Sequence, residues 1–472
     1  MKLPISFVES TRALMGDEEY QELSVALEQE PPASVRLNSK FPGLAACSSI
    51  SGRIPWAAEG YYLNQRLTFT FDPLFHAGCY YVQEASSMFV EQVLRRYVTT
   101  PVKMLDLCAA PGGKSTHARS VLPEGSLLVA NEVIRNRSQI LAENLTKWGY
   151  ADVVVTNNDP SDFSRIGSFF DVILTDVPCS GEGMFRKDPG AIEEWSPENV
   201  EICWQRQRRI ITDIWPCLKP GGILIYSTCT YNTREDEENS TGIRQEFGAE
   251  PLPLAVPTEW NITGSLLVGV DEPVYRFFPH KTQGEGFFLA ALRKPEEDRE
   301  ADTDLFSPKK KKSKGDTAAS PVSKENLAIA KSWLASSDEY NLLVNGTAIT
   351  AFPVYYQNDL ALLRQSLRIV QAGTEVAEVK GKDLIPAHGL AMSRLLKTSV
   401  FSTEALTYEQ AIAYLRKEAI VLPPSVPKGY VLVTYKEIPL GFVKNIGNRA
   451  NNLYPQEWRI RSGYLPDDIR TL

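Results

Sequence analysis

The chain has 472 residues, of which 43% are hydrophobic and 23% are charged, and its formal net charge is -8. These proportions are ordinary for a globular protein, and they exclude a fibrous, collagen-like or wholly disordered chain. At roughly 150 residues per domain, the length predicts about three domains. Because the chain is acidic overall, any contact with RNA or DNA must rest on locally basic surface.

Seven cysteines lie singly along the chain, and no two of them form a CxxC pair. Disulfide frameworks and zinc sites favour paired spacings, so the pattern predicts no metal site and favours a reducing compartment. The first apolar run is short and is broken by Pro4, and no stretch approaches the roughly 18 apolar residues of a membrane span. We therefore expect a cytoplasmic protein with no membrane partner.

The first 294 residues are expected to form two units. Residues 1–75 mix short helical stretches with proline-rich and aromatic-rich sequence, which we interpret as an N-terminal α+β extension. Between residues 76 and 294, apolar runs of strand length alternate with helical patterns; the runs are 104–108, 127–130, 152–156, 170–176 and 223–228. This alternation predicts an α/β domain with a mostly parallel sheet, whose ligand binds outside the carboxyl ends of the strands.

The helices between these strands are marked by their ends. One is predicted at 114–122, directly after the first strand, and a second closes at Gly149, as a left-handed glycine ends a helix. A third begins at Ser196 and Pro197, an N-cap serine followed by proline at the first helical position. We expect this third helix to stop at the Pro-Gly-Gly of 220–222.

A charged segment at 295–325 separates this domain from the rest of the chain. It holds eight acidic and seven basic residues and few apolar ones, so it predicts a flexible linker. Its four consecutive lysines, 309–312, either contact phosphates or form a solvated charge run.

Two further units are predicted beyond the linker. Residues 326–420 have the pattern of an α+β domain, and the apolar runs at 430–435 and 439–446 predict a small β module at 421–472. From residue 380 to the last residue, 13 lysines and arginines stand against 8 acidic residues, so the acidic excess of the chain lies elsewhere.

A turn of small residues, CAAPGGKS (108–115), follows the first strand of the α/β domain. It is not a P-loop, because GxxxxGK[ST] requires glycine where Cys108 stands, and the GxGxxG pattern is absent as well. Such a turn lets backbone N–H groups approach the anionic part of a ligand. Glu132 follows Gly112 by 20 residues, the spacing of an acidic residue that binds ribose hydroxyls. S-adenosylmethionine has both groups that these features would bind, an amino-acid carboxylate for the turn and a ribose for Glu132. The alternatives are that the turn binds another nucleotide or binds no ligand.

Two cysteines follow neighbouring strands of the predicted sheet, Cys179 in DVPCSG and Cys229 in STCT. We expect them to meet at the ligand edge, whereas single cysteines are usually inert packing residues. A thiolate that adds to carbon 6 of cytosine makes carbon 5 nucleophilic towards the methyl group of a sulfonium. Asp176, three residues before Cys179, is placed to stabilise such an adduct near ring nitrogen 3.

At these residues the sequence resembles the Nol/Nop/Sun family of RNA 5-methylcytosine methyltransferases. DLCAAPGGKS, DVPCSG and STCT match the family's motifs, and the similarity covers about residues 70–295. The stretch 430–461 resembles the PUA-like RNA-binding module of the bacterial RsmF-like branch, which methylates small-subunit ribosomal RNA. The resemblance implies a Rossmann-like S-adenosylmethionine-dependent methyltransferase core at 76–294, preceded by an N-terminal extension of RNA-binding type and followed by α+β and PUA-like β modules.

The resemblance also implies roles for particular residues. Cys229 is the expected nucleophile towards carbon 6, Cys179 assists proton removal or product release, and Asp176 stabilises the protonated ring. The residues expected to bind S-adenosylmethionine are Cys108, Ala109, Ala110, Pro111, Gly112, Gly113, Lys114, Glu132, Arg137, Asp159 and Asp176. The candidates for RNA contact, which are otherwise ordinary solvated charges, are Lys444, Arg449, Arg459 and Arg461.

Two other functions stay open at this point. One is a cytosine methyltransferase acting on tRNA, and the other is an RNA-binding ribosome-assembly factor whose methylation is incidental. The presence of both cysteines favours an enzyme. We expect a monomer that acts on small-subunit ribosomal RNA or on the assembling subunit.

Overall fold

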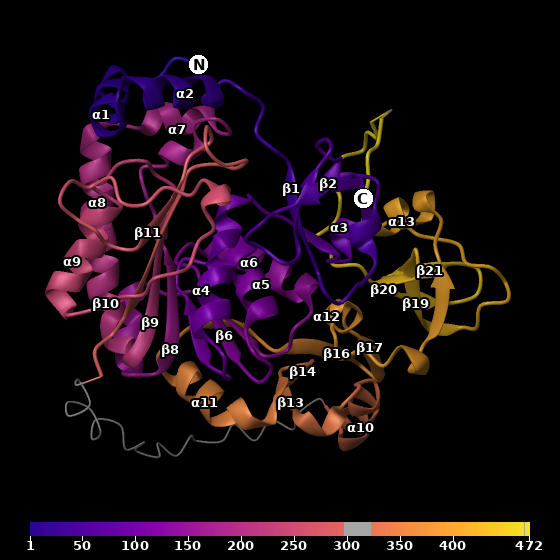
Figure 1. Ribbon diagram of the computed structural model, residues 1–472. Helices are drawn as coiled ribbons and strands as arrows, with labels where there is room; N and C mark the ends of the chain where they lie inside the picture. Colours follow the sequence, from indigo (N-terminus) through magenta and orange to yellow (C-terminus); the bar gives the residue numbers. More distant parts are fainter. Residues whose placement is uncertain (297–321, 467) are drawn as a thin grey trace.

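The computed structural model describes residues 1–296, 322–466 and 468–472 (Figure 1). Its largest sheet has the strand order β10-β12-β9-β8-β5-β6-β7-β15, with β11 paired to β12. The parallel strands at its centre are those predicted: β5 (Lys103–Asp106), β6 (Leu127–Asn131), β7 (Val153–Thr156), β8 (Phe170–Asp176) and β9 (Leu218–Thr228). Antiparallel strands complete the sheet: β10 (Glu250–Pro251), β11 (Val274–Phe277), β12 (Phe287–Arg293) and β15 (Ile369–Ala372).

Helices cover both faces of this sheet. One face carries α4 (Val90–Tyr97), α5 (Gly113–Val121) and α6 (Arg135–Trp148), and the other carries α8 (Pro197–Ile214), α9 (Glu237–Phe247) and α11 (Gln357–Ser366). Successive strand residues point to opposite faces, so Met104 packs in the first core and Leu105 in the second. The α/β fold is therefore a doubly covered sheet, and its parallel strands all end at one edge.

The third predicted helix ends earlier than expected. Helix α8 stops at Ile214, not at 220–222, and one 3-10 turn follows at Trp215–Cys217. Pro216 explains the early end, because proline has no backbone N–H to continue the helical hydrogen bonding. The residues at 220–222 instead lie inside β9, whose first residue, Leu218, pairs with Phe170.

Part of the region predicted as a separate domain at 326–420 belongs to the large sheet of the α/β domain. Strand β15 pairs with β7, with Ile369 opposite Thr156, and α11 packs against the second face. Without β15, the backbone groups of β7 would form an open sheet edge. This region therefore completes the α/β domain as well as forming a domain of its own.

The N-terminal extension consists of a helix pair, a short third helix and a small antiparallel sheet, whose strand β4 lies beyond the boundary expected at residue 75. Its helices are α1 (Ile5–Met15), α2 (Asp17–Leu27) and α3 (Pro73–His76), and its strands, in the order β2-β3-β1-β4, are β1 (Ser34–Leu37), β2 (Ile50–Arg53), β3 (Gly60–Leu63) and β4 (Tyr80–Val82). Phe7 of α1 packs edge-on against Trp195, which follows α7 (Pro189–Glu194). The helix pair is thereby fixed to the α/β domain.

Two further sheets follow the linker segment, most of which (297–321, with the four lysines) lies outside the described residues. The first contains β13 (Tyr340–Asn345), β14 (Ala348–Pro353), β16 (Thr374–Lys380) and β17 (Asp383–Pro386), with α10 (Lys324–Ser332) and α12 (His388–Met392) beside it. The second contains β18 (Ser402–Ala405), β19 (Gly429–Tyr435), β20 (Ile438–Asn445) and β21 (Ala450–Asn452), with α13 (Tyr408–Leu415). Because β18 pairs with β19, this second sheet begins before the boundary expected at residue 420.

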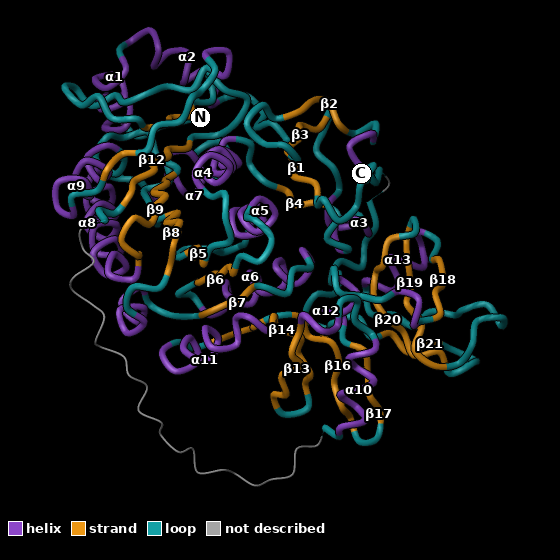
Figure 2. The backbone as a smooth tube through the Cα atoms, turned by 60° about the horizontal axis from the view of Figure 1, so that its bottom comes forward, coloured by secondary structure: helices purple, strands orange, loops and turns teal. Residues whose placement is uncertain are grey.

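The last module packs against the N-terminal extension. Val35 and Leu74 of the extension share one hydrophobic core with Leu415 and Val431 of the last module. The carboxylate of Asp72 accepts a hydrogen bond from the backbone of the final residue at 2.8 Å, and Figure 2 shows the C-terminus beside α3 and β2. In the part of the chain that the structure describes, no helix is long and apolar enough to cross a membrane.

Candidate active site

The two strand-end cysteines meet. Cys179 follows β8 and Cys229 follows β9, and these parallel strands are neighbours, with Asp176 opposite Ser227. The two sulfur atoms lie 3.2 Å apart and each cysteine is partly buried. The pKa of the Cys179 thiol is well above its ordinary value, because it is hydrogen-bonded to Cys229 and because it is buried. Cys179 therefore keeps its proton and can donate it towards the Cys229 sulfur.

An ion pair lies at the same strand ends. Lys114, at the start of α5, places its Nζ 2.8 Å from Oδ2 of Asp176, and the Ser227 hydroxyl donates to Oδ1 at 2.9 Å. Burial alone would lower the pKa of Lys114, yet the Asp176 carboxylate raises it above its usual value. Lys114 is therefore held as an ammonium, which donates to the Asp176 carboxylate next to the strand-end thiols.

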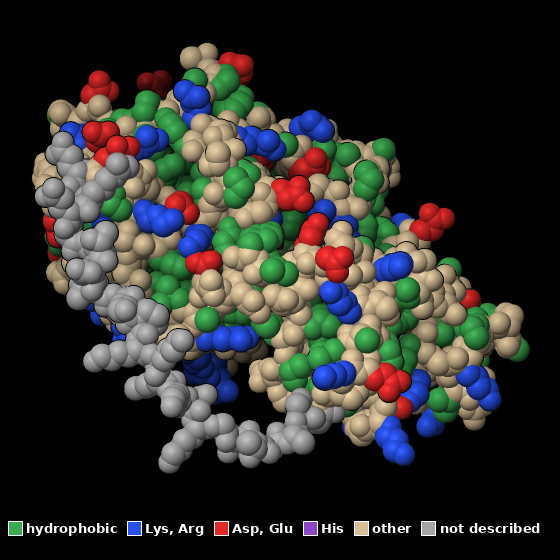
Figure 3. Space-filling view, turned by 90° about the horizontal axis from the view of Figure 1, so that it is seen from below, with side chains coloured by type: hydrophobic (Ala, Val, Ile, Leu, Met, Phe, Trp, Pro, Cys, Tyr) green, Lys and Arg blue, Asp and Glu red, His purple; other side chains and the backbone are tan. Residues whose placement is uncertain are grey.

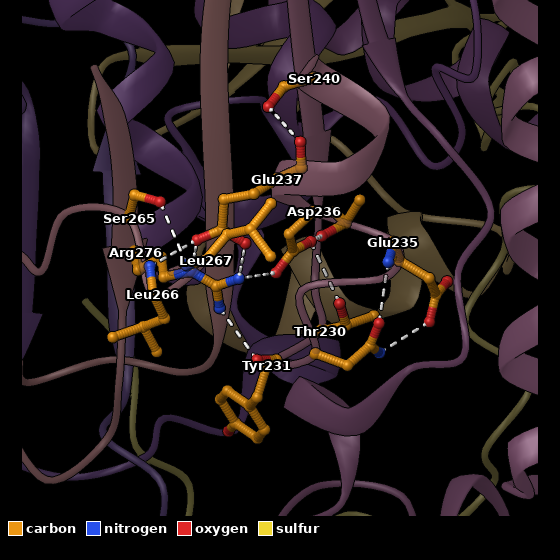
Figure 4. A network of polar contacts seen from close by, with 12 residues as sticks. Thr230, Tyr231, Glu235, Asp236, Glu237, Ser240, Ser265, Leu266, Leu267 and Arg276 are labelled. Carbon is orange, nitrogen blue, oxygen red and sulfur yellow. Dashed lines mark hydrogen bonds and ion pairs between the residues drawn. The ribbon is translucent and has the colours of Figure 1, made fainter. Parts of the chain in front are cut away.

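The turn that carries Cys229 is braced by a buried acidic network (Figure 4). Asp236 accepts hydrogen bonds from the hydroxyls of Thr228 at 2.5 Å and of Thr230 at 3.2 Å, the residues on either side of Cys229. Arg276 of β11 pairs with Asp236, Nη2 to Oδ2, at 3.1 Å. The turn is thus fixed to the sheet through side chains that are fully buried.

The predicted cofactor turn is held open by residues of α6. Gly112 has φ 116°, a left-handed conformation that favours glycine. Arg137 donates to the carbonyl of Ala110 at 2.8 Å, and Asn144 donates to that of Pro111 at 2.8 Å. The side chains that tie down these carbonyls leave the amino end of α5 free to face an anionic group.

The two acidic residues expected at the ribose and the adenine lie at the ends of β6 and β7. Glu132 is 3% exposed and accepts a hydrogen bond from the backbone of Ile134 at 2.8 Å, and Arg137 lies 3.4 Å from its second oxygen. Asp159 caps the turn that follows it by accepting the hydroxyl of Ser161 at 2.7 Å and its N–H at 3.1 Å, and these hydrogen bonds, the hydroxyl first, lower its pKa. Both carboxylates lie at the same strand edge as the cysteines.

Asp106 is a further candidate that the sequence motifs did not single out. It ends β5, it is fully buried, and its Oδ2 accepts the Ser115 hydroxyl at 2.6 Å. Among the described residues, its Oδ1 has no hydrogen-bond donor, and burial raises its pKa to about 7. An unsatisfied buried acceptor beside the turn fits the ammonium group of an amino-acid ligand. In the sequence, this role could have been predicted from the position of Asp106 at the end of a predicted strand, directly before the turn of small residues.

The predicted RNA-contact residues are not equivalent. Arg449, Arg459 and Arg461 are exposed, whereas Lys444 pairs with Asp383 of β17 at 2.6 Å. On the face shown in Figure 3, basic and acidic side chains of the described residues lie interspersed. Any RNA-binding surface there must therefore be a local one.

The fold and the strand-edge turn define the chain as a Rossmann-like methyltransferase that uses S-adenosylmethionine. Three family models agree: residues 99–293 match 16S rRNA methyltransferase RsmB/F, residues 402–460 match the methyltransferase RsmF PUA domain, and residues 3–85 match the N-terminal domain of 16S rRNA methyltransferase RsmF. The chain belongs to the RsmB/F family of 16S rRNA methyltransferases. The predicted family, fold and cofactor are confirmed.

Relatives and solved structures resemble the chain over different lengths. Ribosomal RNA small subunit methyltransferase F of Serratia proteamaculans is 32% identical over 98% of both chains, and that of Shigella boydii is 31% identical over 87% of this chain and 85% of the relative. A methyltransferase homolog protein from Pyrococcus horikoshii has a TM-score of 0.53 at 28% identity and covers 61% of this chain and 94% of its own. NSun6 from the same organism, solved with SFG, has a TM-score of 0.52 at 23% identity, covers 62% and 98%, and supports the fold.

Proposed function

We propose that this chain methylates carbon 5 of a cytosine in small-subunit ribosomal RNA, through a covalent bond between Cys229 and carbon 6. The observation that carries the proposal is the pair of thiols 3.2 Å apart, beside the Lys114–Asp176 pair. A methyltransferase with a nucleophilic substrate atom needs no thiol, whereas carbon 5 of cytosine is a poor nucleophile until a neighbouring addition activates it.

The names of the relatives and the PUA module support the choice of RNA. Methyltransferases from Serratia proteamaculans and Shigella boydii are named for the ribosomal small subunit. A base stacked in a duplex hides carbon 6, so the target cytosine must be unpaired or turned out of its stack. The monomeric state and the cytoplasmic location stay predictions.

The first step is the addition of Cys229. Cys229 reacts as the thiolate, after its thiol proton has passed to solvent. Its sulfur bonds to carbon 6, and the electron pair of the 5,6 double bond moves into the ring. The Lys114 ammonium then gives up a proton through the Asp176 carboxyl group to nitrogen 3, which neutralises the charge there. Both residues lie close to the thiols because β8 and the start of α5 converge at this edge.

S-adenosylmethionine supplies the methyl group that carbon 5 takes up. The residues that fit it are Asp106, for its ammonium group, the turn at 108–114, Glu132 for the ribose and Asp159 for the adenine. These groups are anionic or backbone donors, which suits a ligand with a cationic amine, a carboxylate and hydroxyls.

The last step is loss of the carbon-5 proton and release of Cys229. While Cys229 is free, its hydrogen bond keeps the Cys179 proton in place. Once Cys229 is bonded to carbon 6, that acceptor is gone, and Cys179 can pass its proton to solvent and take the proton from carbon 5. The bond between Cys229 and carbon 6 then breaks, which restores the ring double bond and releases Cys229 as a thiolate, and nitrogen 3 returns its proton to the Lys114–Asp176 pair.

Covalent trapping tests this division of roles. Cys179→Ala should accumulate a protein–RNA complex that survives denaturing electrophoresis, because the adduct forms and is released slowly. Cys229→Ala should form no such complex and should transfer no methyl group. Cys203→Ala, in which a buried cysteine of α8 is changed, is the matched control and should behave as the unchanged protein.

The opposite pattern would reverse the two roles, and methylation retained in both variants would reject the thiol mechanism. Bisulfite sequencing of RNA from a strain lacking the gene identifies the substrate. Loss of a signal in tRNA rather than in small-subunit ribosomal RNA would contradict the proposed RNA.

A further inference from the structure

Each of the two loops that carry the cysteines has a buried glutamate that accepts hydrogen bonds from the other loop. Glu182, which follows Cys179 in its loop, is 2% exposed. One of its oxygens accepts the backbone N–H groups of Tyr231 at 2.6 Å and of Asn232 at 3.0 Å, both in the loop after Cys229. The carboxylate of one cysteine loop therefore holds the backbone of the other.

Glu235 does the same in the reverse direction. It belongs to the loop after Cys229 and is fully buried, and its carboxylate accepts both the N–H, at 3.0 Å, and the hydroxyl of Ser180. Ser180 is the residue directly after Cys179. Gln207 of α8 donates to the same carboxylate at 2.7 Å and to the carbonyl of Pro178 at 3.0 Å. The chain is thus anchored on both sides of Cys179.

The side-chain amide of Asn232 joins the two carboxylates. Its Nδ2 lies 3.0 Å from Oε1 of Glu182 and 3.0 Å from Oε1 of Glu235. A backbone hydrogen bond runs parallel to this link, from the N–H of Gly183 to the carbonyl of Cys229 at 2.7 Å. The two loops are therefore connected by a closed set of hydrogen bonds.

Among the described residues, neutral donors and no cation surround the two carboxylates. In the described part of the chain, neither Glu182 nor Glu235 forms an ion pair with a lysine or arginine; both are surrounded by neutral donors. Burial raises the pKa of Glu182 to about 7 and also raises that of Glu235. Burying a carboxylate without a cation is costly, and here that cost is offset by hydrogen bonds, several of them from the backbone of the other cysteine loop. The geometry that these carboxylates impose is the property that apolar residues could not supply.

We propose that Glu182 and Glu235 are positioning residues that hold the Cys179 and Cys229 sulfur atoms at contact distance. The meaning of that distance rests on the proposed function, in which one sulfur bonds to carbon 6 while the other serves the proton on the adjacent carbon 5. The pairing of β8 with β9 brings both loops to one edge of the sheet. Cys179 lies three residues beyond the end of β8, so the final distance between the sulfur atoms depends on contacts between the loops.

The separation can be measured without RNA by oxidising the pair. Diamide removes one hydrogen from each thiol, a disulfide forms, and the azo bond of the reagent is reduced to a hydrazine. The intact protein should form the Cys179–Cys229 disulfide readily, as read by peptide mass spectrometry. Glu182→Gln and Glu235→Gln place an amide N–H₂ among donors and should slow this reaction by about tenfold or more, because small misplacements of reacting groups have large effects on rate.

The matched control is Glu246→Gln, which changes an exposed glutamate of α9 paired with Arg208. It should form the disulfide at the unchanged rate. We call the hydrogen bonds of Glu182 and Glu235 the brace, and Glu182→Gln and Glu235→Gln the brace variants. In both brace variants, single-turnover methyl transfer should fall by about tenfold to a hundredfold, while calorimetry should show unchanged affinity for S-adenosylmethionine. A general loss of structure would lower both quantities together.

Ser180→Ala decides the question if the glutamine variants do not fold, because it removes one hydroxyl donor from Glu235 and keeps the carboxylate. A slower disulfide supports the brace, and the unchanged rate in Ser180→Ala, or in folded glutamine variants, overturns it. If the brace variants oxidise slowly but the intact protein methylates no cytosine, the proposed function fails and the brace stands.

Discussion

Replacing Arg276 by methionine should destabilise the catalytic domain strongly. Arg276 is 1% exposed, and its Nε donates to Oε1 of Glu237 at 2.6 Å while Nη2 contacts Asp236 and Glu237 (Figure 4). Both carboxylates are fully buried. Methionine keeps the apolar stem of the arginine but removes the cation, and two buried carboxylates are then left without it.

The size of the effect follows from this burial. Removing one partner of a buried ion pair costs about 3–5 kcal/mol. At 2–4 °C per kcal/mol for a domain of about 150–250 residues, the unfolding temperature of the catalytic domain should fall by roughly 6–20 °C. Differential scanning calorimetry measures this shift.

Arg208→Met is the matched control, because Arg208 pairs with Glu246 at 2.7 Å on the surface. Exposed pairs contribute about 0.2–1 kcal/mol, so its transition should move by at most about 4 °C. A fall of that size or less in Arg276→Met would refute the reasoning, because it would mean that the buried carboxylates do not need the cation.

The same variant has a predicted pH dependence. Burial raises the pKa of Asp236 well above its ordinary value, and Arg276 lowers it. A carboxyl whose pKa is higher in the folded than in the unfolded chain binds more protons when folded, so stability falls as the pH rises above the unfolded value. Loss of Arg276 enlarges the difference between the pKa of Asp236 in the folded and in the unfolded chain. The loss of stability in Arg276→Met, relative to the unchanged protein, should therefore be smaller at about pH 5 than at about pH 8. Equal deficits at both values would contradict it.

Three further predictions concern ligands. Glu132→Ala should weaken S-adenosylmethionine binding by about 1.5–3 kcal/mol in calorimetry, because a charge-assisted hydrogen bond is removed; unchanged affinity would reject the ribose assignment. Because the pKa of Asp106 is raised to about 7, cofactor affinity should increase with pH through that value as the carboxylate ionises, and Asp106→Asn should flatten the profile. Changing Arg449, Arg459 and Arg461 together to alanine should weaken RNA binding and reduce its salt slope by about one for each phosphate that an arginine no longer binds. An unchanged slope would make these arginines ordinary surface charges.

The sequence predicted the centre of the site because parallel strands end at one edge. Cys229 directly follows β9 and Cys179 lies three residues beyond β8, so the strand order brings both cysteines to one edge but does not fix the distance between their sulfur atoms. The early end of α8 was missed although Pro216 was visible, because the glycines at 220–222 are the stronger turn signal in sequence.

Other features had no local signal. Glu182 and Glu235 look like ordinary loop acids in sequence, and their value arises from contacts between segments far apart in the chain. Strand β15 is a short, mostly apolar run, and its partner strand β7 precedes it by more than 200 residues in the sequence, with the charged segment 295–325 between them. Pairing of this kind depends on which edge is left open after folding, and composition does not report that.

The N-terminal extension reaches the cofactor turn through one buried arginine. Arg36 of β1 donates to the Thr116 hydroxyl at 2.6 Å and to the carbonyl of Gly113 at 3.3 Å, and its guanidinium lies 4.3 Å from the Trp148 ring. Its Nε donates to Gln83 at 2.9 Å, so the β1–β4 edge and the start of α5 are joined. Since the extension shares a hydrophobic core with the PUA module, a surface that binds RNA there is rigidly placed relative to the methyl donor. Precise placement of this kind is what a reaction at one base of a large RNA requires.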